Sequence, residues 1–363
     1  MPDSSNGTGR LTSVAAVLIT IFIIVVGLIY GRPFLVPLVI AVLISTLIGA
    51  GSDRLSSLGL PWPLPTLASV LALLIGIAAV VNIVASQVDD VSAAWPRYVE
   101  RFQAILNSTA SWLGPNLSAR ITEAFGNLNL MQRIPGIVGS AGGALVTIAL
   151  VTIYVGFLLA ERGSLETKID HLFRSPEKAS QMRRAVEDIS GSIRRYLWIK
   201  TIMALMTAGV CYAALRWIGV DFAETWALMI FLLNYIPSVG SVVGVVFPAL
   251  ITLLQFDTAW QFFIITMALA SAHIVIGNVI EPTYMGRTLN LSPFIVIASL
   301  AFWGLIWGVV GAFLSVPLTT ALLIACSRIP SFHWIAVLLS ADGVDPLDDP
   351  VTAREAPASG VGA

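Results

Sequence analysis

Long apolar runs follow one another along this chain, and they constrain its fold more than any other feature. A helix needs about 20 apolar residues to cross a bilayer. No run shows the strict alternation of apolar and polar residues that a transmembrane β-barrel needs. We therefore expect an all-α integral membrane protein with about eight transmembrane helices, plus amphipathic helices between them. The eight candidate crossings are Leu11–Tyr30, Pro33–Ala50, Leu64–Val88, Ala141–Ala160, Ile193–Trp217, Phe222–Phe256, Ala259–Ile280 and Ser292–Ile324.

Composition excludes several other classes of protein. Of the 363 residues, 57% are hydrophobic and 11% are charged, whereas about 25% of an ordinary soluble chain is charged. The net charge of -1 lacks the basic excess that is typical of nucleic-acid-binding proteins. Cys211 and Cys326 both lie in apolar runs and form neither a disulfide framework nor a metal-ligand spacing. We expect no metal and no cofactor, and we interpret the first apolar run as a retained anchor because no small-residue cleavage site follows it.

One loop, after the fourth crossing, is much more basic than the others. Loops rich in Lys and Arg face the cytoplasm in membrane proteins. Counting crossings from this loop predicts that both termini are cytoplasmic, provided that each long apolar segment crosses once. The basic residues are Arg162, Lys168, Arg174, Lys178, Arg183, Arg184, Arg194 and Arg195.

These features predict seven regions along the chain. Two of them are amphipathic: Tyr98, Phe102 and Ile105 recur at helical spacing in one, and the basic loop is the other. The basic loop either lies at the lipid surface or forms a solvated linker helix. The regions are a cytoplasmic N-terminus (1–10), three transmembrane helices (11–88), an amphipathic extracytoplasmic region (89–140), a transmembrane helix (141–160), the basic cytoplasmic loop (161–192), a transporter core of four membrane segments (193–327) and a disordered cytoplasmic tail (328–363).

The sixth apolar segment, Phe222–Phe256, contains FLLNYIPSVGSVVGVVFPAL and carries its own break. Pro237 lacks a backbone donor, and Gly240 and Gly244 allow unusual dihedrals and close approach. A broken helix in a membrane is tolerated where its freed backbone groups line a wet cavity, as in transporters. Asn234, Tyr235 and Ser238 offer polar contacts to a solute there. The alternative for the glycines is helix packing, since Gly-x-x-x-Gly is also a packing motif.

The last segment, Ser292–Ile324, contains the same combination of glycines followed by a proline. Its glycines Gly304, Gly308 and Gly311 precede Pro317, as Gly240 and Gly244 precede Pro248 in the earlier one. Paired interruptions indicate repeated halves around a transport site. Each long segment either crosses once as a broken helix or folds back as two short segments.

Ionisable residues cluster between His273 and Pro293. His273, Gly277 and Glu281 share roughly one helix face, and Asn278 lies one turn before Glu281. An ionisable group in a membrane segment is a candidate for function. Glu281, just before Pro282, either couples to a solute or a proton or forms a structural pair with Arg287. His273 carries a proton or is a hydrogen-bonded packing residue. Lys200 is expected to extend its amine toward the cytoplasmic surface, and Asp257 to lie in a turn.

Two strings carry a resemblance to a known family. Asn-Tyr-Ile-Pro-x-x-Gly begins at Asn234, and Glu-Pro-x-x-x-Gly-x-x-Leu-x-Leu-x-Pro begins at Glu281. With the layout of spans from Leu11 to Arg328, they resemble the autoinducer-2 exporter family of permeases. The resemblance implies a multi-pass transporter of the bacterial inner membrane, with about eight spans and cytoplasmic termini. Some relatives are linked to efflux of the signal autoinducer-2, and others are described as sodium/proton antiporters. Carried over by motif, the positions of interest are Asn234, Pro237, Gly240, Glu281, Pro282, Gly286 and Pro293.

Three functions remain open, and none is enzymatic. The chain lacks a nucleotide-binding loop, a Gly-x-Ser-x-Gly nucleophile motif and a His-Glu-x-x-His zinc motif. The first function is a secondary transporter or exporter of a small polar solute, with autoinducer-2 as one candidate. The second is a sodium or other cation/proton antiporter, and the third is a membrane scaffold or regulator that transports nothing. The expected partners are the solute or ion, the lipid bilayer and, because glycine-rich helices allow close contacts, further copies of the chain. The predicted pathway residues are Asn234, Tyr235, Pro237, Ser238, Gly240, Gly244, His273, Asn278, Glu281, Pro282, Gly286 and Pro293.

Overall fold

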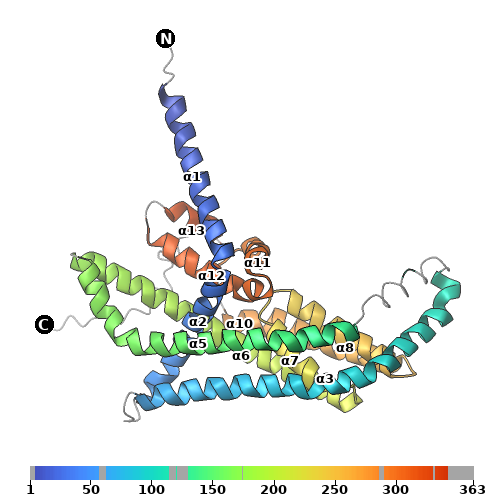
Figure 1. The fold of residues 1–363 in the computed structure, drawn as a ribbon. Helices are drawn as coiled ribbons and strands as arrows, with labels where there is room; N and C mark the ends of the chain where they lie inside the picture. The colour runs from blue at the N-terminus through green and yellow to red at the C-terminus, as the bar shows by residue number, and fades with distance from the viewer. Residues whose placement is uncertain are drawn as a thin grey trace. The chain divides into compact units, whose positions relative to one another are not determined.

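The computed structural model describes residues 5–56, 63–113, 120, 130–173, 175–285, 290–329 and 332–341, and these residues are helical apart from short connections (Figure 1). The one β-type pairing among them is an isolated bridge between Leu291 and Ser340. The all-α class is confirmed for this part of the chain. The helices are α1 (Ser5–Tyr30), α2 (Arg32–Ser56), α3 (Pro63–Leu113), α5 (Leu130–Leu172), α6 (Pro176–Ile218), α7 (Ala223–Leu233), α8 (Val239–Gln255), α9 (Trp260–Ile274), the π-helix η1 (Val275–Ile280), α10 (Glu281–Met285), α11 (Pro293–Trp307), α12 (Val309–Ser327) and α13 (His333–Leu339).

The expected count of eight spans is not confirmed. In the described part of the chain, four helices are long and apolar enough to cross a membrane, and a fifth counts if the bent pair Val146–Glu161 and Gly163–Leu172 is one span. The four apolar stretches are Arg32–Gly49, Pro176–Ile218, Trp260–Met285 and Val309–Ser327. The shorter apolar helices are Ala15–Tyr30, Leu74–Ile83, Ala223–Leu233, Val239–Gln255 and Pro293–Trp307. One span is missing because Phe222–Phe256 forms the two shorter helices Ala223–Leu233 and Val239–Gln255. Ser292–Ile324 also divides, but its second half, Val309–Ser327, is itself long enough to cross.

Three helices run well past the predicted spans. The helix α3 continues without a break from its apolar part to Leu113. The helix α5 continues beyond its predicted span to Leu172, and α6 begins before its predicted span, at Pro176. Separate amphipathic helices were expected there, but the amphipathic stretches simply prolong the apolar helices. Of the predicted amphipathic region 89–140, residues 114–119 and 121–129 lie outside the described residues.

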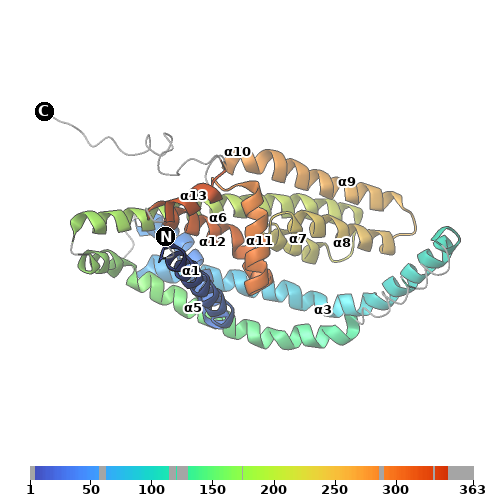
Figure 2. The ribbon, with the colours of Figure 1, turned by 90° about the horizontal axis from the view of Figure 1, so that it is seen from above.

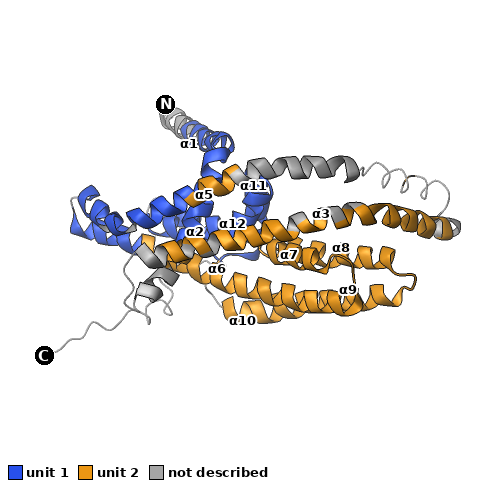
Figure 3. Ribbon diagram, turned by 60° about the horizontal axis from the view of Figure 1, so that its bottom comes forward, with its two compact units in different colours: residues 1–45, 153–185, 291–363 blue, residues 46–152, 186–290 orange. Residues whose placement is uncertain are grey.

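The chain forms two compact units, one of residues 1–45, 153–185 and 291–363 and the other of residues 46–152 and 186–290 (Figure 3). We call them unit 1 and unit 2. In unit 2, α8 and α9 run side by side in opposite directions, joined by the short loop 256–259 (Figure 2). A core without solvent exposure lies between its helices, and it includes Cys211, Leu215, Ile230, Ile265 and Leu269.

In unit 1, α11 and α12 fold back on each other at Gly308, whose φ of 68° suits glycine. The indole of Trp303 donates a hydrogen bond to the Thr319 hydroxyl at 3.2 Å. The expected disorder of 328–363 is wrong for His333–Leu339, which forms α13 because its apolar side chains, Ala336 above all, bury against α12. Residues 342–363 lie outside the described part of the chain.

Candidate functional site

The predicted break in Phe222–Phe256 is observed as a helical hairpin in unit 2. The helix α7 ends at Leu233, α8 begins at Val239, and the five residues Asn234–Ser238 form the tip. Pro237 cannot donate to the preceding turn, and Ser238 has φ 63°, which is uncommon for a residue other than glycine. The chain therefore reverses here, and α8 packs back along α7. We call this element the α7–α8 hairpin.

Gly240 makes the tight reversal possible. A Cβ atom at this position would lie 2.3 Å from the carbonyl oxygen of Leu233, so only glycine fits without displacement. Gly244 lies one turn further, where a Cβ would come within 3.0 Å of the His273 ring and 3.1 Å of Ile230. Both glycines are buried and serve close helix packing. The two glycines therefore serve helix packing within the same hairpin that the break produces.

The tip of the hairpin contacts α6 through hydroxyl groups. The hydroxyls of Tyr235 and Thr201 are 2.7 Å apart. Thr201 donates its only hydroxyl proton to the Leu197 carbonyl at 2.6 Å, so the Tyr235 hydroxyl is the donor between the two. Tyr196 is buried nearby and interacts electrostatically with Tyr235 and Glu281.

A buried ion pair lies beside this contact. The Lys200 ammonium donates to the Glu281 carboxylate at 2.6 Å, and the two side chains are 10% and 14% exposed. The expectation that Lys200 extends to the surface is wrong, because the carboxylate on the neighbouring helix offers its amine a buried partner. Arg287, the partner expected for Glu281, lies outside the described residues. The ion pair, Tyr196, Thr201 and Tyr235 together form what we call the tip cluster.

The helix that carries Glu281 changes its winding directly before it. The residues Val275–Ile280 form a π-helix between α9 and α10. Such wide turns occur mostly as short insertions, frequently at functional sites. Within this π-helix Gly277 is half-buried, and Asn278 is exposed.

His273 is buried against the hairpin, one helical turn from Leu269. Its Nδ1 lies 2.9 Å from the Leu269 carbonyl oxygen. A carbonyl only accepts, so Nδ1 carries the proton and Nε2 is the bare nitrogen. Nε2 has no hydrogen-bond partner among the described residues and faces the backbone of Gly244. In this arrangement the His273 ring packs against the hairpin at Gly244.

The remaining predicted residues do not join the tip cluster. Asn234 and Pro237 are half-buried within the tip, and Ser238 and Pro282 are exposed. Gly286 lies outside the described residues, and Pro293 begins α11 in unit 1. The sequence reasoning missed Tyr196 and Thr201. The available signal was their spacing around Lys200, since Tyr196 and Lys200 are four residues apart at the start of an apolar run.

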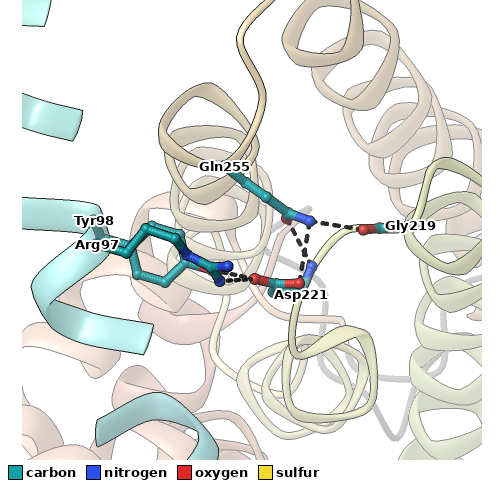
Figure 4. A network of polar contacts seen from close by, with 5 residues as sticks. All are labelled: Arg97, Tyr98, Gly219, Asp221 and Gln255. Carbon is teal, nitrogen blue, oxygen red and sulfur yellow. Dashed lines mark hydrogen bonds and ion pairs between the residues drawn. The ribbon is translucent and has the colours of Figure 1, made fainter. Parts of the chain in front are cut away.

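A second polar cluster lies at the other end of α6, about 26 Å along the helix from Thr201. Asp221 is its centre (Figure 4): Arg97 pairs with its carboxylate at 2.8 Å and the Tyr98 hydroxyl donates to it at 2.6 Å. The Gln255 amide donates to Asp221 and to the Gly219 carbonyl, and it accepts from the Asp221 backbone N–H. Burial and the neighbouring carboxylate raise the pKa of Tyr98, so its phenol stays a proton donor.

The Asp221 cluster connects three elements of unit 2. It joins α3 to the turn before α7 and to the end of α8, and the Arg101–Asp257 pair at 2.8 Å adds a contact to the next loop. Asp257 lies in that loop, as expected. An open hollow of about 490 Å³ adjoins the cluster. Its lining residues are Gln87, Asp90, Ala93, Ala94, Arg97, Asp221, Phe222 and Glu224.

Comparison with known proteins finds transport proteins along nearly the whole chain. A family model described as AI-2E family transporter matches residues 17–331, which include both Pro/Gly segments. The AI-2 transport protein TqsA of Escherichia coli (strain K12) is 30% identical over 327 residues, covering 88% of this chain and 92% of the relative. The "Putative transport protein YhhT" of the same strain is 27% identical over 327 residues, covering 89% and 92%. A similarly named Haemophilus influenzae protein is 28% identical over 350 residues, covering 93% and 98%.

Proposed function

Because the chain belongs to the AI-2E transporter family, we propose that it is a secondary transporter that moves a small polar solute along the α7–α8 hairpin. The observation that carries the proposal is the tip cluster. A broken membrane segment ends beside a buried ion pair and two tyrosines, in a part of the chain that is otherwise apolar. Hydroxyl groups and a charged pair supply donors and acceptors for a polar solute.

The cargo that fits this proposal is a small polar molecule that leaves the cell. TqsA is named as an AI-2 transport protein, so autoinducer-2 is the first solute to test. The driving force is an ion gradient or the gradient of the solute itself, because the chain lacks a nucleotide-binding loop. Asn234, Tyr235, Pro237 and Ser238 remain the proposed solute contacts at the tip.

The proposed setting is the bacterial inner membrane, with both termini in the cytoplasm. If each of the two Pro/Gly segments enters and leaves on one side, the number of crossings falls by two and stays even. The termini then remain on the same side, and α6 and α9 cross in opposite directions. The two segments enter from opposite faces, which is the arrangement of an inverted repeat.

Thiol labelling tests this topology. We would introduce single cysteines at Thr258 and Asn290 in a chain that lacks Cys211 and Cys326, and label them with an impermeant maleimide in whole cells. Hairpins predict labelling from outside at Thr258 and not at Asn290. The reverse pattern would mean that Phe222–Phe256 crosses once.

Flux in reconstituted vesicles tests transport itself. We expect uptake of labelled autoinducer-2, or of another small polar solute, into inverted vesicles that contain the protein. Tyr235→Phe removes the donor to Thr201 but keeps the ring, and we expect it to lower flux about tenfold while the protein folds. The control is Tyr284→Phe, whose exposed side chain lies outside the tip cluster. Equal flux in the two variants would remove the tip from the pathway, and no flux of any solute would favour the scaffold function.

The Lys200–Glu281 pair favours cation/proton antiport as the second candidate function. A carboxylate that follows a π-helix and pairs with a lysine can exchange that partner for a cation or a proton. The test replaces both residues with methionine, because an apolar pair of similar volume often preserves stability. Antiport predicts that sodium-dependent proton flux disappears in this double variant. Persisting proton flux would make the pair structural.

A further inference from the structure

The lipid-facing side of α6 shows where the membrane begins and ends along unit 2. Trp198 and Trp217 are 62% and 81% exposed. They are 19 residues apart in the sequence, or about 28 Å along a helix, close to the hydrocarbon thickness of about 30 Å. Tryptophan is enriched at both membrane–water interfaces. Apart from Arg216, which directly precedes Trp217, the large exposed side chains between the two are apolar: Ile202, Leu205, Met206 and Val210.

The neighbouring span gives the same boundaries. Trp260 at the start of α9 and Tyr284 in α10 are exposed, and the exposed side chains between them include Phe263, Met267 and Val279. The ion pair of Lys200 and Glu281 joins the two helices two and three residues inside Trp198 and Tyr284. The two aromatic residues therefore lie at one level, which marks a single membrane surface.

Two arginines lie directly beyond this surface. Arg194 and Arg195 precede Trp198 by four and three residues, so they share its helix face. Both are exposed, and neither forms an ion pair with a described residue. Their guanidinium groups therefore lie at the depth of the lipid headgroups, and no carboxylate in the described part of the chain pairs with them.

We propose that Arg194, Arg195 and Trp198 form a binding site for an anionic phospholipid headgroup. A guanidinium binds phosphate oxygens with two parallel hydrogen bonds, and the tryptophan anchors the site at the interface. Basic residues next to a membrane helix attract anionic lipids of the cytoplasmic leaflet. The site goes beyond transport, because it neither includes the tip cluster nor depends on a solute. It also places the Lys200–Glu281 pair about one helical turn inside the headgroup layer.

Lipid-dependent stability tests the site. The full-length protein is placed in nanodiscs of phosphatidylcholine, with or without phosphatidylglycerol, and its unfolding midpoint is measured in each. We expect phosphatidylglycerol to raise the midpoint of the unmodified protein by about 5 °C. R194Q/R195Q should lose at least half of this rise. Because each variant is compared with itself in two lipids, a lower baseline stability does not affect the result.

The matched control is K178Q/R184Q, which removes two exposed charges from the same helix. Arg184 is 14 residues from Trp198, or about 21 Å, so the control should keep the full rise. An equal loss in both double variants would mean general attraction of a basic helix and would overturn the site. A full rise in R194Q/R195Q would overturn it too. Inorganic phosphate added to phosphatidylcholine nanodiscs should not raise the midpoint; a rise of similar size would mean that the arginines bind free phosphate and not lipid.

Discussion

The close approach at Gly240 makes a quantitative prediction about the α7–α8 hairpin. In Gly240→Ala the new Cβ would lie 2.3 Å from the Leu233 carbonyl oxygen, so the two helices must separate by about 1 Å to reach ordinary contact. Overpacking of this kind costs about 1–3 kcal/mol. Alanine returns at most about 1 kcal/mol through helix propensity. The variant should therefore be less stable by about 1–2 kcal/mol, and its flux should fall because Tyr235 moves away from Thr201.

The assay is thermal unfolding in one detergent, together with flux in vesicles. Gly209→Ala is the matched control, since a Cβ there meets nothing within 4 Å and the residue is an exposed glycine of α6. It should be as stable as the parent or more stable by up to about 1 kcal/mol. The stability of Gly244→Ala should lie between those of the other two variants, because the His273 ring, 3.0 Å from the added Cβ, has to move only slightly. Equal stability of Gly240→Ala and Gly209→Ala would refute the tight reversal.

Three further changes test other parts of the chain. Glu281→Gln should destabilise the protein by about 3 kcal/mol in thermal unfolding, because Lys200 is left buried without its counter-charge; unchanged stability would mean that water reaches the ammonium. Asp221→Asn should cost about 1 kcal/mol or less, and less in high salt, because its arginine partner is largely exposed; chemical denaturation at two salt concentrations measures this. Gly311→Ala should destabilise the hairpin of α11 and α12, since a Cβ there would overlap the Trp303 carbonyl. Gly304→Ala should not, because the nearest neighbour of its Cβ lies at 3.9 Å. Equal thermal unfolding midpoints for these two variants would contradict the packing.

Hydropathy and breaker residues were sufficient to predict which parts of the chain are apolar helices and where two of them are interrupted. They did not predict the result of an interruption. Whether Pro237 kinks a span or ends a hairpin depends on the contact of Gly240 with Leu233, which no local pattern encodes. Helix ends were missed for a related reason: α3 and α6 continue past their apolar stretches, α3 even through Pro96, because a helix does not have to end where the membrane ends.

The candidate site was predictable only in part. The motif around Asn234 located the break, and Glu281 stood out as an ionisable residue. Its partner was not recognised because Lys200 is 81 residues away in the sequence. A lysine near a span end usually extends to the surface, and only the packing of α6 against α10 gives it a carboxylate instead. The hydroxyl partner of Tyr235 was missed in the same way, since Thr201 also bonds a carbonyl of its own helix and is 34 residues away in the sequence.

The two polar clusters of unit 2 are separated by a sealed apolar core, and this constrains any transport mechanism. Cys211, Leu215, Ile230 and Leu269 have no solvent exposure, so a polar solute cannot pass between α6, α7 and α9 in this conformation. The polar Thr207 in the same stretch is buried and donates its hydroxyl proton to the Met203 carbonyl, so it has no free donor for a solute. If the solute passes along the α7–α8 hairpin, as proposed, the hairpin has to move against α6 and α9. The glycine contact holds α7 to α8, so the hairpin would move as one body. Its two ends would then release in turn, with the tip leaving Thr201 and the base leaving the Asp221 cluster.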